Sequence, residues 1–145
     1  SSLRHVLEMS SAVHQRGEPA ALAVVVETEG STYVQAGAMA LFGTEGGQVG
    51  WLSGGCLEPE IARRARHAAA VGAAGAMEID TRDDEDLFAG SAVGCRGRLR
   101  QVLLPLVRLP GWVTAVQAWW AGHGTLRLSC LVYTLMLPKI RIVYN

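Results

Sequence analysis

The chain has 145 residues, half of them hydrophobic, and its 13 basic and 13 acidic side chains cancel to a formal net charge of zero. A chain of this length can bury a core as one domain. Its apolar content and balanced charge exclude an intrinsically disordered protein and a general nucleic-acid binder.

Three cysteines, an odd number, occur without regular spacing. No window of about 18 apolar residues predicts a transmembrane helix, and no charged segment followed by an apolar segment opens the chain. We therefore expect a cytoplasmic protein with free thiols and no membrane span.

Hydrophobic periodicity predicts the elements of the first half of the chain. Apolar residues at helical spacing predict a first helix over residues 3–17, which ends at Gly17. The compact apolar run at residues 20–30 predicts a central strand buried on both faces. Residues 37–55 predict two short strands around a turn at Thr44–Gly47. A helix follows over residues 57–70, with Pro59 in its first turn, where its missing N–H is tolerated.

The second half predicts strands at residues 75–80 and 98–107, a short helix at 112–121 and a final strand at 125–137. Strands alternate with helices, but the hairpin interrupts the alternation. The pattern therefore predicts a single α/β domain over residues 1–145, either a mixed-sheet layered α/β domain or an α+β domain.

A thiol lies at a strand-to-helix junction in the segment "WLSGGCLEPEI". A helix N-terminus lowers the pKa of a thiol such as Cys56, whereas the nearby carboxylates of Glu58 and Glu60 raise it, and the balance stays open. Gly54 and Gly55 can admit positive φ angles and the close approach of a ligand. A tight turn followed by a small helical residue is the structural alternative.

A second thiol, Cys95, also follows a glycine just before a strand, and two such thiols could converge at one sheet edge. The spacing of Cys56 and Cys95 does not match a structural zinc site. A soft metal or a sulfur-bearing ligand remains open. The turn Gly30–Ser31–Thr32 offers amide and hydroxyl donors to an anion, or is an ordinary turn.

Three segments occur in the order "ALAVVVETEGSTYVQAGAMALF", "GQVGWLSGGCLEPEI" and "AVGCRGRLRQVLLPL". Together they resemble the XdhC/CoxI family, the accessory proteins of xanthine dehydrogenase and carbon monoxide dehydrogenase, over about residues 20–106. The resemblance implies a chaperone that binds molybdenum cofactor (molybdopterin) transiently. The implied partners are a cysteine desulfurase, which supplies the terminal sulfur, and a xanthine dehydrogenase-type molybdenum hydroxylase, which receives the cofactor.

The resemblance also implies a Rossmann-like domain after this one, which residues 1–145 do not include, and it leaves a homodimer open. The family motifs fall on Ser53, Gly54, Gly55, Cys56 and Glu58, on Gly94, Cys95 and Gly97, and on Gly30, Ser31 and Thr32. We hypothesise that Cys56 and Cys95 protect or orient the cofactor and can contact its molybdenum, while glycine amides, Ser31 and Thr32 bind its phosphate. Arg96, where the family often has glycine, could add a bidentate phosphate contact.

Two alternatives compete with the carrier. One is a small thiol-dependent enzyme with Cys56 as nucleophile, but His67 lies about 16 Å along the helix from it, too far to act as its base. The other is a structural or oligomerisation domain in which the glycines only permit tight turns. No nucleophile, base and orienting residue occur together, so we expect a carrier and not a turnover catalyst.

Overall fold

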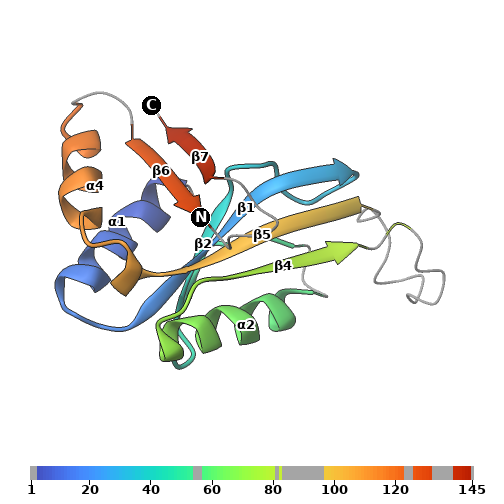
Figure 1. The fold of residues 1–145 in the computed structure, drawn as a ribbon, viewed down its shortest axis with the longest axis horizontal. Coiled ribbons are helices and arrows are strands. Elements are labelled where there is room, and N and C mark those ends of the chain that lie inside the picture. The colour runs from blue at the N-terminus through green and yellow to red at the C-terminus, as the bar shows by residue number, and fades with distance from the viewer. Residues whose placement is uncertain are drawn as a thin grey trace.

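The computed structural model of the chain describes residues 3–53, 57–80, 82, 97–122, 126–131 and 139–144 (Figure 1). The helices are α1 (Leu3–Gln15), α2 (Glu58–Val71) and α4 (Trp112–Trp120), with a 3-10 turn η1 (Leu106–Arg108). The strands of the main sheet are β1 (Ala20–Gly30), β2 (Met39–Gly43), β3 (Gln48–Val49), β4 (Gly75–Asp80) and β5 (Gly97–Pro105). A separate hairpin contains β6 (Leu126–Leu131) and β7 (Lys139–Tyr144).

The main sheet has the strand order β3-β2-β1-β5-β4, so β1 lies at its centre. Every pair of neighbouring strands is antiparallel. The predicted fold class, a single α/β or α+β domain, is confirmed, and the antiparallel pairing corresponds to the α+β alternative. The sheet is not mixed, because α2 carries the chain across the sheet from β3 at one edge to β4 at the other without making them neighbours.

Helices cover both faces of this sheet, as Figure 1 shows. On one face, Ala21, Ala23 and Val25 of β1 pack in the core cluster that contains the buried side of α2. On the other, Leu22 and Val24 pack in the cluster of α1 and α4. The prediction of a central strand buried on both faces is therefore confirmed for the first six residues of β1, all of which are buried.

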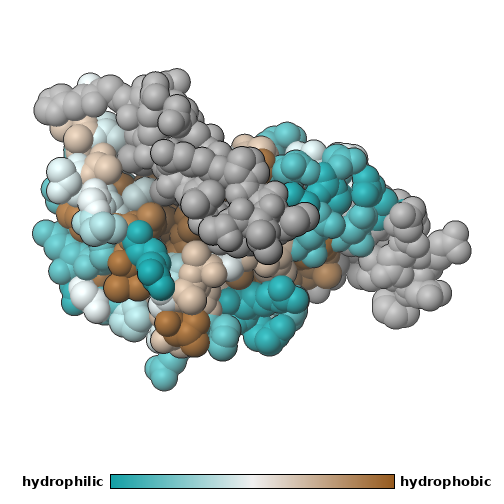
Figure 2. Space-filling view, in the orientation of Figure 1, coloured by the Kyte–Doolittle hydropathy of each residue, from teal (hydrophilic) through white to brown (hydrophobic). Residues whose placement is uncertain are grey.

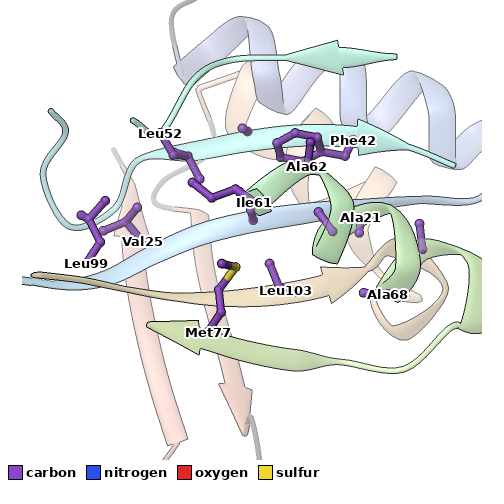
Figure 3. Packing of buried hydrophobic residues seen from close by; sticks show 14 residues of the cluster. Ala21, Val25, Phe42, Leu52, Ile61, Ala62, Ala68, Met77, Leu99 and Leu103 are labelled. Carbon is purple, nitrogen blue, oxygen red and sulfur yellow. The ribbon is translucent and has the colours of Figure 1, made fainter. Parts of the chain in front are cut away.

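The helix α2 packs closely on the sheet because its buried stripe consists mostly of alanine, with Ile61 near its start (Figure 3). Pro59 lies in its first turn, as expected. Gly72 ends it in a left-handed conformation at φ 71°, and its N–H donates to the carbonyl of Ala68. The predicted helix is confirmed, and local signals explain both of its ends.

A β-bulge between Val25 and Glu27 changes which side chains of β1 share a face. Beyond it, Glu27 lies opposite Arg100 and Glu29 lies opposite Arg98. Seven charged residues lie together on the face of the sheet that α1 and α4 cover, at the end of the sheet beyond these helices. We call them the charged ladder: Glu27 and Glu29 of β1, Arg98 and Arg100 of β5, Glu78 and Asp80 of β4, and Arg82.

The last part of the chain differs from the prediction. A single final strand was expected over residues 125–137, but β6 ends at Leu131 and a further strand, β7, pairs with it in antiparallel register. Residues 132–138 lie outside the described part of the chain. Lys139, Ile140, Arg141 and Ile142 alternate polar and apolar side chains, so the sequence did carry the period-two signal for β7.

The predicted strand at residues 98–107 is confirmed up to Pro105. Leu106 and Val107 lie instead in η1. Because Pro105 has no N–H to donate to a strand neighbour, the chain leaves the sheet there.

Candidate functional site

One end of the sheet brings the predicted site segments together. The strands β1 and β4 run in the same direction and both end there, level with the start of β5 (Figure 1). The shorter strand β3 ends further back, opposite Leu41, and α2 begins after it. The predicted thiols Cys56 and Cys95, with Gly54, Gly55, Gly94 and Arg96, lie outside the described residues. Their convergence therefore stays a prediction, and the described site consists of the residues that flank them.

The turn after β1 and the start of β5 lie in direct contact. Gly30, at φ 73°, is paired with Gly97. A Cβ atom on Gly97 would lie 2.5 Å from the backbone oxygen of Ser31 and 2.8 Å from Cγ2 of Thr32. The sequence predicted these two segments as parts of one site, and the structure places them side by side.

The space beside Gly97 is filled by the protein's own backbone. The two nearest atoms to its missing side chain are carbonyl oxygens, those of Ser31 and Glu29, at 2.5 and 2.6 Å. The hydroxyl of Thr32 donates to the carbonyl oxygen of Val34 at 2.7 Å. Ser31 is exposed at the tip of the turn. Gly97 thus permits two backbone segments to approach each other, and Ser31 presents its side chain to solvent.

Glu58 organises the turn that leads into α2. Its side chain is buried, with 3% exposed. Its Oε1 atom accepts hydrogen bonds from the backbone N–H of Leu52 at 3.1 Å and from the backbone N–H and hydroxyl of Ser53 at 2.8 and 2.9 Å. Its Oε2 atom accepts one from Nε2 of Gln48 at 2.8 Å.

Four donors therefore hold this carboxylate, and through it they hold the backbone on the N-terminal side of residues 54–56. Charge-assisted hydrogen bonds to a buried carboxylate are strong and directional, so the turn is preorganised. Glu58 was predicted as a cofactor-binding residue. Its contacts indicate a positioning residue that fixes where the following Gly-Gly-Cys segment begins.

The other first-turn carboxylate, Glu60, faces outward and pairs with Arg63 at 2.7 Å. The hydrogen bond from Arg63 lowers the pKa of Glu60 below its ordinary value. Leu57, the N-cap residue of α2, makes no side-chain capping bond. The positive end of the helix dipole thus lies at Leu57, and the two first-turn carboxylates, Glu58 and Glu60, are each bound by donors of their own.

The start of α2 and the start of β5, which flank the two predicted thiols, pack on the same core. Leu52, which precedes the turn, packs in one cluster with Val25 of β1, Leu99 of β5 and Ile61 of α2, as the labelled side chains of Figure 3 show. The start of α2 and the start of β5 are therefore fixed relative to each other. The chain returns from each of the two cysteine-containing segments of the predicted site to this shared core.

The charged ladder lies beside Gly30 and Gly97. Arg98 is 11% exposed and pairs with Glu27, Glu29 and Glu78, the last at 2.7 Å. Hydrogen bonding from Arg98 lowers the pKa of Glu29, and Arg82, at 2.8 Å from it, adds to this effect. Because these arginines are bound to carboxylates within the ladder, they are not free to bind a phosphate.

Sequence reasoning missed the ladder and the role of Gln48. The glutamates of β1 and the arginines of β5 each recur at two-residue spacing, a pattern that places like charges on one face of a strand. That signal could have predicted a charged face, although not which strands share it. Nothing local to Gln48 predicts its bond to Glu58, since the pairing depends on how the hairpin meets α2.

Over the described part of the chain, no three His, Cys, Asp or Glu side chains gather in a way that could hold a metal ion. Nor does any described helix combine the length and apolarity that crossing a bilayer requires.

Comparison with known proteins shows which family these residues resemble. The model of the XdhC and CoxI family matches residues 13–80, which include β1, the hairpin, α2 and β4. A probable xanthine dehydrogenase component from Bacillus subtilis (strain 168) is 37% identical over 89 residues, which make up 61% of this chain and 27% of that protein. The aligned segment thus spans about a quarter of this relative's length.

A solved structure shares the fold. The crystal structure of a xanthine dehydrogenase from Bacillus halodurans superposes with a TM-score of 0.73 at 22% identity, over 96% of this chain and 52% of that chain. At this identity the likeness shows the fold alone. The family match confirms the resemblance seen in the sequence: residues 13–80 of this chain are similar to the XdhC and CoxI family.

Proposed function

We propose that this chain is the cofactor-binding part of an accessory protein for a xanthine dehydrogenase-type molybdenum hydroxylase. It binds molybdopterin-type cofactor as cargo in the cytoplasm, receives help from a cysteine desulfurase that supplies the terminal sulfur, and passes the cofactor on. The observation that carries the proposal is the turn that Glu58 holds, which lies inside the family segment and leads straight into Gly54, Gly55 and Cys56.

The chemistry of the described residues fits part of this role. The N-terminus of α2 offers the positive end of a helix dipole to an anionic group such as the cofactor's phosphate, although Pro59 in its first turn supplies no N–H. Ser31 adds an exposed hydroxyl at the same end of the sheet. The ladder arginines contribute no phosphate contact, so in this proposal Arg96 and the amides of residues 54–56 supply the remaining donors.

The thiols have a separate part in the proposal. Cys56 and Cys95 each precede one of the two elements, α2 and β5, whose starts the core fixes relative to each other. In the proposal they hold the sulfur-containing end of the cofactor or its molybdenum. A soft metal and its sulfur ligands are partners that thiolates prefer. The role is that of binding and protection, with no bond made or broken by the chain itself.

A structural role is the second candidate, and one observation favours it. The space beside Gly97 is taken by backbone oxygen atoms of the turn after β1, so this glycine serves tight packing and not a ligand. If Gly54, Gly55 and Gly94 serve the same purpose, the segment is a structural or oligomerisation domain of an accessory protein.

Loading experiments separate these candidates. The chain is produced in cells that make molybdenum cofactor, and bound molybdenum and pterin are measured for the wild type and for Cys56→Ala, Cys95→Ala and Cys130→Ala. We expect Cys56→Ala and Cys95→Ala each to lose most of the bound cofactor, with Cys130→Ala as the matched thiol control that retains it. Equal loading of all four proteins contradicts the thiol role, and an empty wild-type protein of native fold supports the structural candidate.

A further inference from the structure

The strand β4 forms one edge of the main sheet, and no other described strand pairs with its outer side. It pairs with β5 in unbroken register from Gly75 to Asp80, with no bulge and no proline. Along such an edge, alternate residues direct their N–H and C=O groups outward, ready to pair with another extended segment. At the opposite edge, β3 has only two residues.

Charge alternates across the sheet toward this edge. On the ladder face, β1 contributes Glu27 and Glu29, β5 contributes two arginines, and β4 contributes Glu78 and Asp80. The rows are therefore acidic, basic and acidic, with Arg82 bound to Asp80 at the end of the outermost row. The ladder has four carboxylates and three arginines, so it keeps a net negative charge. The hydrophilic surface in Figure 2 covers the projecting end of the sheet and the outer side of α2.

The other face of the same edge has the opposite charge. A cavity of about 420 Å³ opens beside Gly75 and Ala76 and is lined on the α2 side by Arg63, Arg64 and His67. Glu60 pairs with both arginines, at 2.7 and 3.7 Å, which leaves this side with an excess of positive charge. Apolar atoms of Ala68, Val71 and Leu103 complete the lining.

We propose that β4 is a docking edge for an extended peptide segment of a partner protein in which basic residues alternate with apolar ones. The segment adds to the sheet as a further strand beside β4 and pairs with its outward backbone groups. Its basic side chains lie on the ladder face beside Glu78 and Asp80. Its apolar side chains enter the cavity beside α2. The arginines of this cavity repel basic side chains, so the peptide binds with its basic side chains on the ladder face.

A second copy of this chain fits the edge poorly. Two β4 strands that pair antiparallel about a two-fold axis present Glu78 and Asp80 of both copies on the same ladder face, and the register centred on Glu78 places one Glu78 directly opposite the other. Like charges directly opposite each other destabilise a strand pair. The charge pattern therefore selects a different, basic segment.

The test uses a fluorescently labelled octapeptide of alternating arginine and valine, titrated into the chain and followed by anisotropy. A peptide of the same composition with its arginines in adjacent pairs serves as control. We expect saturable binding of the alternating peptide, weaker binding of the control, and slower hydrogen exchange on binding at every second amide of β4 only.

Charge variants test the specificity. The double variant Glu78→Gln, Asp80→Asn removes two cross-strand charge pairs, and at about 0.2–1 kcal/mol each we expect binding to weaken by roughly two- to thirty-fold. Glu18→Gln, which removes an exposed carboxylate paired only with Arg16, is the matched control and leaves binding unchanged.

Equal affinity for both peptides, or exchange protection outside β4, overturns the proposal. Protection of β4 that rises with protein concentration in the absence of peptide overturns it in favour of self-association. The hydrogen-exchange measurement on the wild type remains decisive if the double variant fails to fold. None of these results depends on cofactor loading, so this inference and the proposed function can fail separately.

Discussion

Replacing Glu58 tests most directly how the candidate site is held together. Replacing it by alanine removes the acceptor of four hydrogen bonds. The hydroxyl of Ser53 can rotate to another acceptor and the half-buried Gln48 can reach water, but the buried N–H groups of Leu52 and Ser53 lose the oxygen that they share. A buried N–H without a partner costs about 1–3 kcal/mol, so the two together cost about 2–6 kcal/mol of unfolding free energy.

The isosteric change Glu58→Gln separates charge from geometry. Its side-chain oxygen can keep the three bonds that Oε1 accepts. Gln48 can turn its amide to accept from the new NH₂ group, although it then loses its bond to the carbonyl oxygen of Gly50. We therefore expect a loss of only about 1–2 kcal/mol, the difference between charged and neutral hydrogen bonds. Glu60→Gln changes an exposed carboxylate in the same helical turn and is the matched control, with a urea midpoint equal to that of the wild type.

Urea denaturation followed by far-UV circular dichroism measures all three variants, and the slope of each transition reports whether unfolding stays two-state. A Glu58→Ala protein within about 1 kcal/mol of the wild type refutes the reasoning, because two unpaired buried amides cannot cost so little. Equal losses for Glu58→Gln and Glu58→Ala also refute it, since the retained oxygen would then contribute nothing.

Three further predictions follow from described contacts. Gly97→Ala pushes a Cβ atom against backbone oxygens and lowers unfolding free energy by about 1–3 kcal/mol, whereas Gly43→Ala, with nothing within 4 Å, leaves the urea midpoint near that of the wild type. Hydrogen bonds from Arg82 lower the pKa of Asp80 from 3.8 to about 2. Its contribution to folding stability is therefore complete above pH 3.8 and is lost as the pH falls toward 2. Thermal melts should show this loss of stability in the wild type and a smaller loss in Asp80→Asn. Gln101 is fully buried, and neither polar atom of its side chain has a hydrogen-bond partner among the residues that the structure describes. Gln101→Leu should therefore raise the melting temperature by removing an amide that costs about 1–3 kcal/mol, and a fall in the melting temperature would contradict this.

Much of the architecture follows from local patterns. The helical spacing of residues 3–15, the compact run at residues 20–30 and the glycine-rich turn of the hairpin each predict the element that forms. Pro59 and Gly72 mark the two ends of α2 because each acts on the backbone of its own residue. The family resemblance, too, lies in short contiguous motifs.

The elements that sequence reasoning misjudged also have local explanations. The strand β7 was missed although its alternation was visible, because the apolar run before it was assigned to one long strand. The strand β5 ends at Pro105, and the rule for proline in strands would have placed that end correctly.

Only the tertiary structure decided the strand order, the direction of each pair and the partners of the charged residues. Arg98 and Glu29 pair across 69 residues of sequence, and the bulge in β1 sets the register that brings them together. Gln48 reaches Glu58 because the hairpin packs against the start of α2. Hydrophobic periodicity and turn chemistry act within a few residues, so the sequence alone predicts them. The pairing of distant side chains depends on the register of neighbouring strands, which only the folded sheet determines.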